Sequence, residues 1–534
     1  MRPHFAASPA ISLRARAGAL SVMTVMLALG GCAVGPKFAE PATSLNADWS
    51  AKDNPQFAAR APAETAWWKS FNDPVLDALI AAAYRQNLPL QVAGVRIYEA
   101  RAQLGIAVGR QYPQVQAAFG SATSVGLSEN AANSALADHH FQDYQLGFDA
   151  SWEMDFWGRY RKGVRAEQAS YLASIADYQE ALVSLTAEVA RTYAVIRTFE
   201  VLIEQGRQNV AIQEEGRRIA ESRYRNGATS ELDVAQAVTL LESTRASIPI
   251  LEIGLAQAQN ALCTLLGQPT GTVQEMLSGT RGIPSPRLQV EVSIPADMLR
   301  RRPDIRSVEL SAVAQCDRIG VARADLYPSF TLFGSIGTQT SSNGGRLSGN
   351  SGFSDLFGPK SWFHNFGLSF LWPLFNYGRI KNNIRLQDAR LQELLVQYQN
   401  SVLQAAQEVE DGMVGYLKAQ ESAVSQQNAA NGAQRAVDLA FIQYREGAVD
   451  FQRVLDAQRS LLQEQNALAQ TRSSVVTNLI ALYKALGGGW EISEGQPVVS
   501  QSTQEEMQNR TNWGDYFKEP PTSTSSNGSS PTPR

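Results

Sequence analysis

The five residues YRNGA at positions 224–228 return as YREGA at positions 444–448, an offset of 220 residues. At the same offset Gly158-Arg159 matches Gly378-Arg379, whereas the Tyr-Pro pairs further upstream match at an offset of 215. A repeat of this kind predicts two copies of one plan: helix, strand, loop, strand, long helix, tight turn and shorter helix. The five-residue difference falls in the expected hairpin loop, where an insertion costs little.

Strict alternation of side chains marks the clearest strand, from Asp143 to Phe156. Its even positions are apolar and its odd positions polar, acidic or glycine, which predicts a strand with two unlike faces. The hairpins are expected over 113–156 and 328–375, with strands of about ten residues, the length of a tilted transmembrane strand. A soluble sheet with one buried face is the alternative. The long Ser- and Gly-rich stretches 124–138 and 339–352 favour exposed extracellular loops instead.

Two proline-free stretches, 159–225 and 379–445, predict the long helices. Apolar residues recur in them at steps of three and four, and each would be about 100 Å long as a single helix. Helices of that length need partners, so we expect coiled-coil packing against return helices at 230–266 and 450–486.

Each helix pair is expected to reverse direction at a glycine. Gly227 and Gly447 are suited to the left-handed conformation that ends a helix, and they form the predicted helix-turn tips. Ser230 and Asp450 stand where the N-caps of the return helices should be.

These features divide the chain into six expected segments. They are a signal peptide at 1–31, a lipidated N-terminal segment at 32–72, a first repeat at 73–266, a linker at 267–294, a second repeat at 295–490 and a disordered tail at 491–534.

The N-terminus has the features of a lipoprotein signal. Three arginines precede an apolar run, Ala17–Leu29, that is too short to span a bilayer. The run ends in LGGC at 29–32, which resembles a lipoprotein box, and this predicts a diacylglycerol and an N-acyl chain on Cys32. An ordinary secretory signal with a chance cysteine is the alternative. By the same resemblance, Ala33 in place of an Asp predicts the outer membrane as the destination.

Four strands cannot close a barrel, and an open sheet edge cannot face lipid. Copies of the chain must therefore share one barrel. Eight strands from a dimer would leave a bore filled by side chains, whereas twelve strands from a trimer leave room for water. The polar and acidic strand face favours the trimer.

Composition and motifs argue against several other classes. The net charge is −4 and no basic cluster with interleaved aromatics occurs, so no nucleic-acid partner is expected. The four histidines lack metal-ligand spacing, and no catalytic motif is present, so we expect neither a metal nor another cofactor nor enzyme activity. Cys263 and Cys316 are interpreted as core residues rather than a disulfide. No run of eighteen apolar residues follows Cys32, so no transmembrane helix is expected.

Several motifs resemble those of the TolC-type outer-membrane factors, in particular their lipoprotein branch. They are CAVGPKF at 32–38, Trp67-Trp68 with Asp73-Pro74, LRRRPDIR at 299–306 and ALGGGW at 485–490. The resemblance implies a mixed α+β membrane protein: a trimer with a twelve-stranded outer-membrane barrel, four strands per protomer, continued by a periplasmic α-barrel of coiled-coil helices. It also implies docking onto a periplasmic adaptor and an inner-membrane pump, most simply of the resistance-nodulation-division type.

The resemblance further implies a periplasmic gate at the helix-turn tips. By matching position, Tyr444 and Asp456 belong to the constricting helix pair, and Asp233 to the outer pair as a latch partner. The chain departs from the family pattern in carrying Arg453 three residues before Asp456, so an Arg453–Asp456 or an Arg453–Asp233 link is possible. Asp233 could equally cap its helix, and Tyr444 could equally pack within the coil.

The function implied is a passive exit duct for drugs or other small molecules. Channels for protein secretion or metal export, and a structural outer-membrane lipoprotein, are the alternatives. The long helices argue against a stand-alone pore, which would have no use for them.

Overall fold

The computed structural model describes residues 33–42, 45–46, 48–51, 54–58, 66–130, 139–285, 290–291, 301–342 and 351–517. The chain forms two compact units, and each is described by itself. The strand unit takes in the N-terminal segment up to Glu40 together with 100–171 and 310–395. The second unit takes in 41–99, 172–309 and 396–534. It is called the hairpin unit because it contains the turns of the two helical hairpins.

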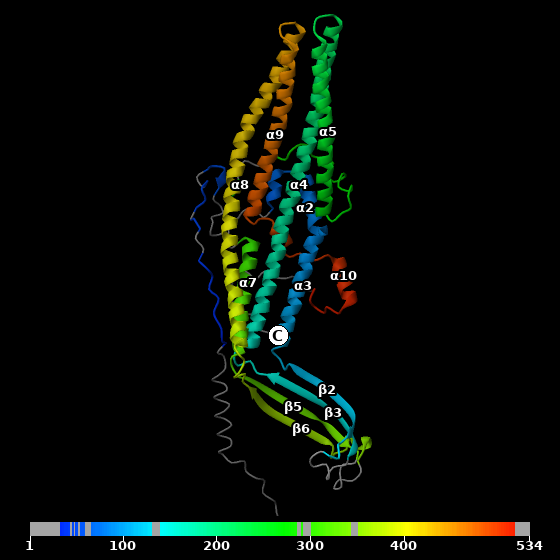
Figure 1. Ribbon diagram of the computed structural model, residues 1–534, viewed down its shortest axis with the longest axis vertical. Coiled ribbons are helices and arrows are strands. Elements are labelled where there is room, and N and C mark those ends of the chain that lie inside the picture. Colours follow the sequence, from blue (N-terminus) through cyan, green and yellow to red (C-terminus); the bar gives the residue numbers. More distant parts are fainter. Residues whose placement is uncertain are drawn as a thin grey trace, which may run out of the picture. The chain divides into compact units, whose positions relative to one another are not determined.

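The strand unit contains one antiparallel sheet of four strands (Figure 1). These are β2 (Val115–Gly126), β3 (His140–Glu153), β5 (Ser329–Ser341) and β6 (Trp362–Leu371), in the order β2-β3-β5-β6. A short 3-10 helix, η3 (Phe353–Asp355), lies between β5 and β6 in the chain. The two hairpins pair through β3 and β5, which leaves β2 and β6 as the edges of the sheet.

The register of the sheet separates its two faces as the alternation predicts. Directly opposed residues share a face, so Phe148, Ile336 and their neighbours form an apolar face. This face is open in the protomer: Phe148 is 66% exposed and Phe370 is 71% exposed. The opposite face carries Asp143 and Asp149, and Gln339 and Ser341 both donate hydrogen bonds to the carboxylate of Asp143.

The polar face also holds phenylalanines, each beside a glycine. Phe119, Gly147, Gly337 and Phe363 form one row across the four strands. A Cβ atom on Gly147 would lie 2.8 Å from the ring of Phe119, and one on Gly337 would lie 3.0 Å from the ring of Phe363. The glycines thus make room for rings that lie against the neighbouring strand. The register places Val115 and Ala117 on this polar face too.

The long helices have the bounds that the sequence indicates: α4 is Arg159–Arg225 and α8 is Arg379–Arg445. Each follows a glycine with positive φ, Gly158 at 78° and Gly378 at 84°, which explains the Gly-Arg landmark of the repeat. In the first copy the Asp155 carboxylate accepts hydrogen bonds from the backbone N–H groups of residues 160 and 161 and so caps α4.

The hairpin unit contains the return helices α5 (Glu231–Leu265) and α9 (Phe451–Ala485). The helix expected at the start of the first repeat is divided into α2 (Pro74–Gln86) and α3 (Leu88–Gly109). Asn87 makes the break, because its side-chain oxygen accepts from the N–H of Leu90 and its amide donates to the carbonyl of Leu265. The second repeat begins with α7 (Pro303–Ala324). A short parallel pair joins β1 (Phe57–Ala58) to β4 (Val290–Glu291).

Two signature motifs hold the hairpin unit together. Trp67, in the 3-10 helix η1 (Trp67–Phe71), is fully buried and stacks on Tyr483 with ring centroids 5.2 Å apart. The guanidinium of Arg302 donates to Asp304, to Glu408 and to the carbonyl of Ala485, each at 2.8 Å. Arg302 therefore ties the start of α7 to α8 and to the end of α9.

The expectation of a disordered tail from residue 491 is wrong for residues up to 517. The structure has a 3-10 helix η4 (Trp490–Ser493) and a helix α10 (Gln501–Arg510), capped by Ser500. Beyond α10 the ring of Phe517 packs edge-on against Tyr98 of α3 at 4.9 Å, with Trp513 beside it. Aromatic burial of this kind offsets the cost of ordering the chain. Residues 518–534 lie outside the described part.

No helix in the described ranges is both long and apolar enough to cross a membrane. Cys263 and Cys316 are both buried free thiols, as the sequence suggests.

Candidate functional site

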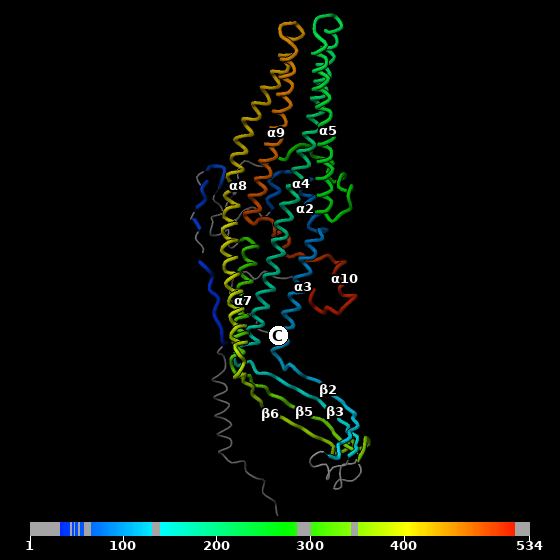
Figure 2. The backbone as a smooth tube through the Cα atoms, in the orientation of Figure 1, coloured from blue at the N-terminus to red at the C-terminus, as the bar shows by residue number. Residues whose placement is uncertain are grey.

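The helix pairs α4–α5 and α8–α9 each reverse direction at a tight turn (Figure 2). Gly227 has φ 70° and Gly447 has φ 75°. In the first tip the N–H of Ala228 donates to the carbonyl of Arg223 at 2.8 Å, and that of Gly227 donates to Tyr224 at 2.9 Å. In the second tip the N–H of Ala448 likewise donates to the carbonyl of Gln443, and that of Gly447 donates to the carbonyl of Tyr444. This is the pattern of a Schellman motif, in which glycine at the left-handed position ends the helix.

The starts of the two return helices differ. Asp450 caps α9, since its side chain accepts a hydrogen bond from the N–H of Arg453 at 3.3 Å. Ser230 occupies the N-cap position of α5 but makes no side-chain capping bond. The Asp233 carboxylate instead accepts a hydrogen bond from the hydroxyl of Thr229. Within the protomer, Asp233 therefore makes this hydrogen bond inside its own helix-turn tip.

Tyr444 lies in the core between the two helical hairpins, α4–α5 and α8–α9. Its side chain is 2% exposed and its ring lies 5.1 Å from that of Phe451. The surrounding cluster draws on both hairpins: it consists of Ala220, Ala237, Leu240, Ala440, Phe451, Val454 and Leu455. Burial raises the pKa of the Tyr444 phenol above its ordinary value. Within the protomer this tyrosine has the packing role that the sequence left open.

Asp456 and Arg453 are both exposed on α9. Asp456 accepts a hydrogen bond from Gln452 at 2.9 Å and lies 3.7 Å from a guanidinium nitrogen of Arg459. In the described part of the protomer, Arg453 bonds to neither Asp456 nor Asp233. The two links that the sequence left open are therefore not made within one copy.

The arginine that joins the hairpins is Arg223, which the sequence did not single out. Its guanidinium carbon lies 4.7 Å from the ring centroid of Tyr444, and its Nη1 donates to the Tyr444 carbonyl at 2.6 Å. Arg445 makes a second link, to Glu215 at 3.1 Å. The repeat does contain a signal, because the position that matches Arg223 in the second copy holds Gln443. Because only the first tip carries an arginine at this position, the contact between the two tips is asymmetric.

Two further expectations concern other parts of the chain. Cys32 lies outside the described residues, which begin at Ala33. Where the structure describes the chain, no three His, Cys, Asp or Glu side chains are grouped so that they could hold a metal ion.

Comparison with known proteins identifies the family. The model of the family described as outer membrane efflux protein matches residues 79–268 and 294–488. The chain is 32% identical over 489 residues to the pyoverdine export outer membrane protein OpmQ of Pseudomonas aeruginosa, covering 88% of this chain and 97% of that one. It is 30% identical over 472 residues to the probable outer membrane lipoprotein SilC of Salmonella typhimurium, covering 88% and 98%.

A solved structure, of the outer-membrane channel OprN, superposes with a TM-score of 0.80 at 31% identity, covering 86% of this chain and all of that one. These matches confirm the fold expected from the sequence, a TolC-like outer-membrane channel with a helical barrel and strands. Channels of this kind are trimers in the outer membrane that extend into the periplasm and work with adaptor proteins and inner-membrane pumps. Theirs is a family of efflux channels, not of enzymes. The chain belongs to the outer membrane efflux protein family.

Proposed function

We propose that this chain is the passive exit duct of a tripartite system that exports drugs or other small molecules. The supporting observation is the pair of 67-residue helices, each of which ends in a glycine turn and returns antiparallel. A simple pore has no use for helices of this length, whereas a duct that must meet a periplasmic adaptor does. The energy would come from an inner-membrane pump, most simply of the resistance-nodulation-division type, and the chain itself would catalyse no reaction.

A deletion strain tests this proposal. Loss of the gene should sensitise the cells to several unrelated antibiotics, and a plasmid copy should restore resistance. A panel with no change in susceptibility, in a strain that produces the adaptor and the pump, would contradict an efflux role.

We further propose that the tips form the periplasmic gate. Arg223 and Tyr444 hold the two hairpins of one copy together, as their contacts indicate. Asp456 and Arg453, which are exposed on α9, and Asp233 in the first turn of α5 are then available to neighbouring copies of the trimer. In this proposal Gly227 and Gly447 set the sharp turns that bring these side chains to the channel entrance.

The lipid belongs to the same proposal. Cys32 would carry a diacylglycerol and an N-acyl chain, and the residues that follow support a fixed attachment point. Val34 donates to the carbonyl of Trp157 at 3.1 Å, and the thiol of Cys316 lies 3.7 Å from the carbonyl of Pro36. The segment after Cys32 is thus held in place within the strand unit, next to the start of α4. Mass spectrometry of the mature N-terminal peptide would detect the lipid directly.

A further inference from the structure

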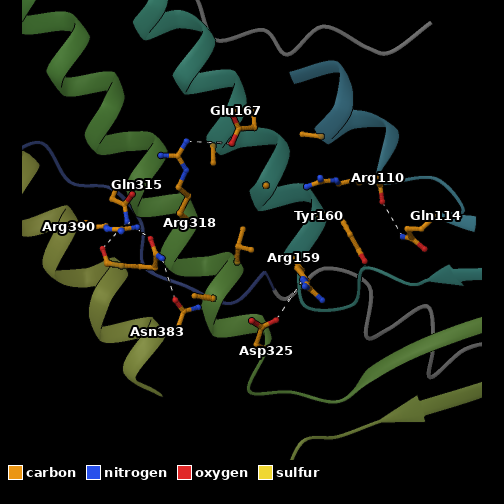
Figure 3. A pocket seen from close by; sticks show the side chains of 16 residues that line it. Arg110, Gln114, Arg159, Tyr160, Glu167, Gln315, Arg318, Asp325, Asn383 and Arg390 are labelled. Carbon is orange, nitrogen blue, oxygen red and sulfur yellow. Dashed lines mark hydrogen bonds and ion pairs between the residues drawn. The ribbon is translucent and has the colours of Figure 1, made fainter. Parts of the chain in front are cut away.

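A cavity of about 880 Å³ lies within the strand unit, between the ends of four helices (Figure 3). Its lining comes from the end of α3, the start of α4, the end of α7 and the start of α8. Four arginines line it: Arg159, Arg318 and Arg390 stand on α4, α7 and α8, and Arg110 directly follows the last residue of α3. Glu167 and Asp325 are its only acidic residues among those the structure describes there.

Two of the four arginines are neutralised. Arg159 lies 3.7 Å from the carboxylate of Asp325, and Arg318 lies 3.5 Å from that of Glu167. Arg110 and Arg390 have no carboxylate within ion-pair distance in the described part of the chain. The cavity therefore carries two uncompensated positive charges in each copy.

Neutral side chains complete the lining. The Gln315 amide donates to Gln387 at 2.8 Å, and the Gln387 amide reaches Asn383 at 3.5 Å. Amides already held in a chain of hydrogen bonds lose little freedom when a ligand binds. They stand on α7 and α8, next to the exposed Arg390.

The opposite side of α7 indicates which way the cavity faces. Cys316 and Gly320 contact the N-terminal segment, and Asp317 bonds to Lys162 in a mostly buried pair. These three positions lie on the helix face turned away from Arg318 and Asp325. The N-terminal segment continues directly from the expected lipid at Cys32, so the face it covers is the outer one.

The sheet supports the same orientation. Arg159 and Tyr160 line the cavity, and both bond to Glu153, at 3.4 and 3.1 Å. Glu153 belongs to the polar face of β3, with Asp149 and Asp143. Because the apolar face must meet lipid, the polar face and the cavity beside it face the water-filled interior.

We propose that this cavity is a binding site for small anions, which bear carboxylate, phosphate or sulfonate groups, on the path through the channel. Guanidinium groups bind such oxyanions through paired, charge-assisted hydrogen bonds. Three copies would place six uncompensated arginines around one bore, and a positive field in a confined space raises the local concentration of anions. The inference rests on the proposed duct and adds a class of cargo to it.

The test uses the purified trimer, with citrate as the probe, in titration calorimetry at low ionic strength. Arg110→Gln with Arg390→Gln should weaken citrate binding by at least about tenfold, because two charge-assisted contacts are lost. Arg165→Gln with Arg323→Gln is the matched control: both arginines are exposed in the same unit and outside the cavity lining. The control pair should change the dissociation constant by less than about twofold, since distant exposed charges are screened.

Two outcomes would overturn the proposal: equal loss in both pairs, which indicates a diffuse surface field, or citrate binding that neither pair affects. A second readout is the ion selectivity of single channels in planar bilayers, which should shift towards cations in the Arg110→Gln, Arg390→Gln variant alone. Failure of the anion site and failure of the proposed efflux function give different results. Citrate binding with this pattern, in a protein whose deletion leaves drug susceptibility unchanged, would support the site and contradict the proposed function.

Discussion

The guanidinium of Arg223 covers the ring of Tyr444 at 4.7 Å and donates a hydrogen bond to the carbonyl of the same residue at 2.6 Å. Both contacts join the first hairpin to the second at the tips. A cation over an aromatic ring and a charge-assisted hydrogen bond each contribute about 1 to 2 kcal/mol when partly shielded from water. This one side chain therefore has enough energy to bias a closed tip over an open one.

Arg223→Gln, which copies the residue at the matching position of the second repeat, should loosen the tip. We expect the open fraction to rise by about tenfold or more, which corresponds to a loss of about 1.4 kcal/mol. Single-channel recording in planar bilayers would measure it as higher mean conductance. Arg225→Gln is the control, because the only bond of its guanidinium in the described structure is a long one to a carbonyl of its own helix. Unchanged conductance in Arg223→Gln would remove this residue from the gate.

Asp456→Ala combined with Tyr444→Phe should also raise conductance and sensitise cells to large antibiotics. Asp456 bonds only along its own helix within the described protomer, so its loss should act at the neighbouring copy. Glu446→Ala, which removes an exposed acid from the turn itself, is the control and should have little effect. If the double variant conducts as the parent does, the gate lies elsewhere.

Gly367→Ala should destabilise the sheet. A Cβ atom there would lie 2.6 Å from the ring of Phe333 on the adjacent strand, so the ring must move or the strands must separate. Overpacking of this kind costs about 1 to 3 kcal/mol, which should appear as a lower midpoint of thermal unfolding. Phe333→Leu should rescue it. Gly120→Ala is the control, since its nearest neighbour would lie at an ordinary 3.5 Å. Equal midpoints for the two glycine variants would show that the ring does not confine Gly367.

Arg302→Lys should destabilise the hairpin unit by about 2 to 4 kcal/mol, because a lysine cannot make the forked contacts to Asp304 while also reaching Glu408 and Ala485. Chemical denaturation followed by helix content would measure the loss. Arg306→Lys, in the same motif and with no side-chain ion pair in the described structure, should stay close to the parent. Similar losses in both variants would show that the forked contacts of Arg302 are not the cause, whereas no loss in either would show that a positive charge alone suffices.

Cys32→Ala behind a cleavable signal should still insert into the outer membrane, with reduced yield. The open apolar face of the sheet provides the membrane contact, so the lipid is not the only anchor. Fractionation of membranes and periplasm would decide it. Complete recovery of the variant in the periplasm would contradict this division of roles.

The sequence determined the elements of this protein because their causes are local. Absence of proline and a three-to-four residue period define α4 and α8, and glycine at 227 and 447 ends them. Alternation from Asp143 onward predicts β3 and its two faces, although the strand runs from His140 to Glu153 and so ends three residues before Phe156. Each of these features depends on neighbours along the chain, so each can be recognised without knowing what the segment touches.

The tertiary structure decided which residues meet. Arg223 reaches Tyr444 across 221 positions, the tail aromatics return to Tyr98, and four arginines that are far apart in the sequence line one cavity. Such contacts depend on strand register and on how the hairpins pair, and these are fixed by the sum of many weak long-range interactions. Local sequence propensity does not include these long-range interactions. The helices and strands could therefore be predicted from the sequence, whereas the contacts between them could not.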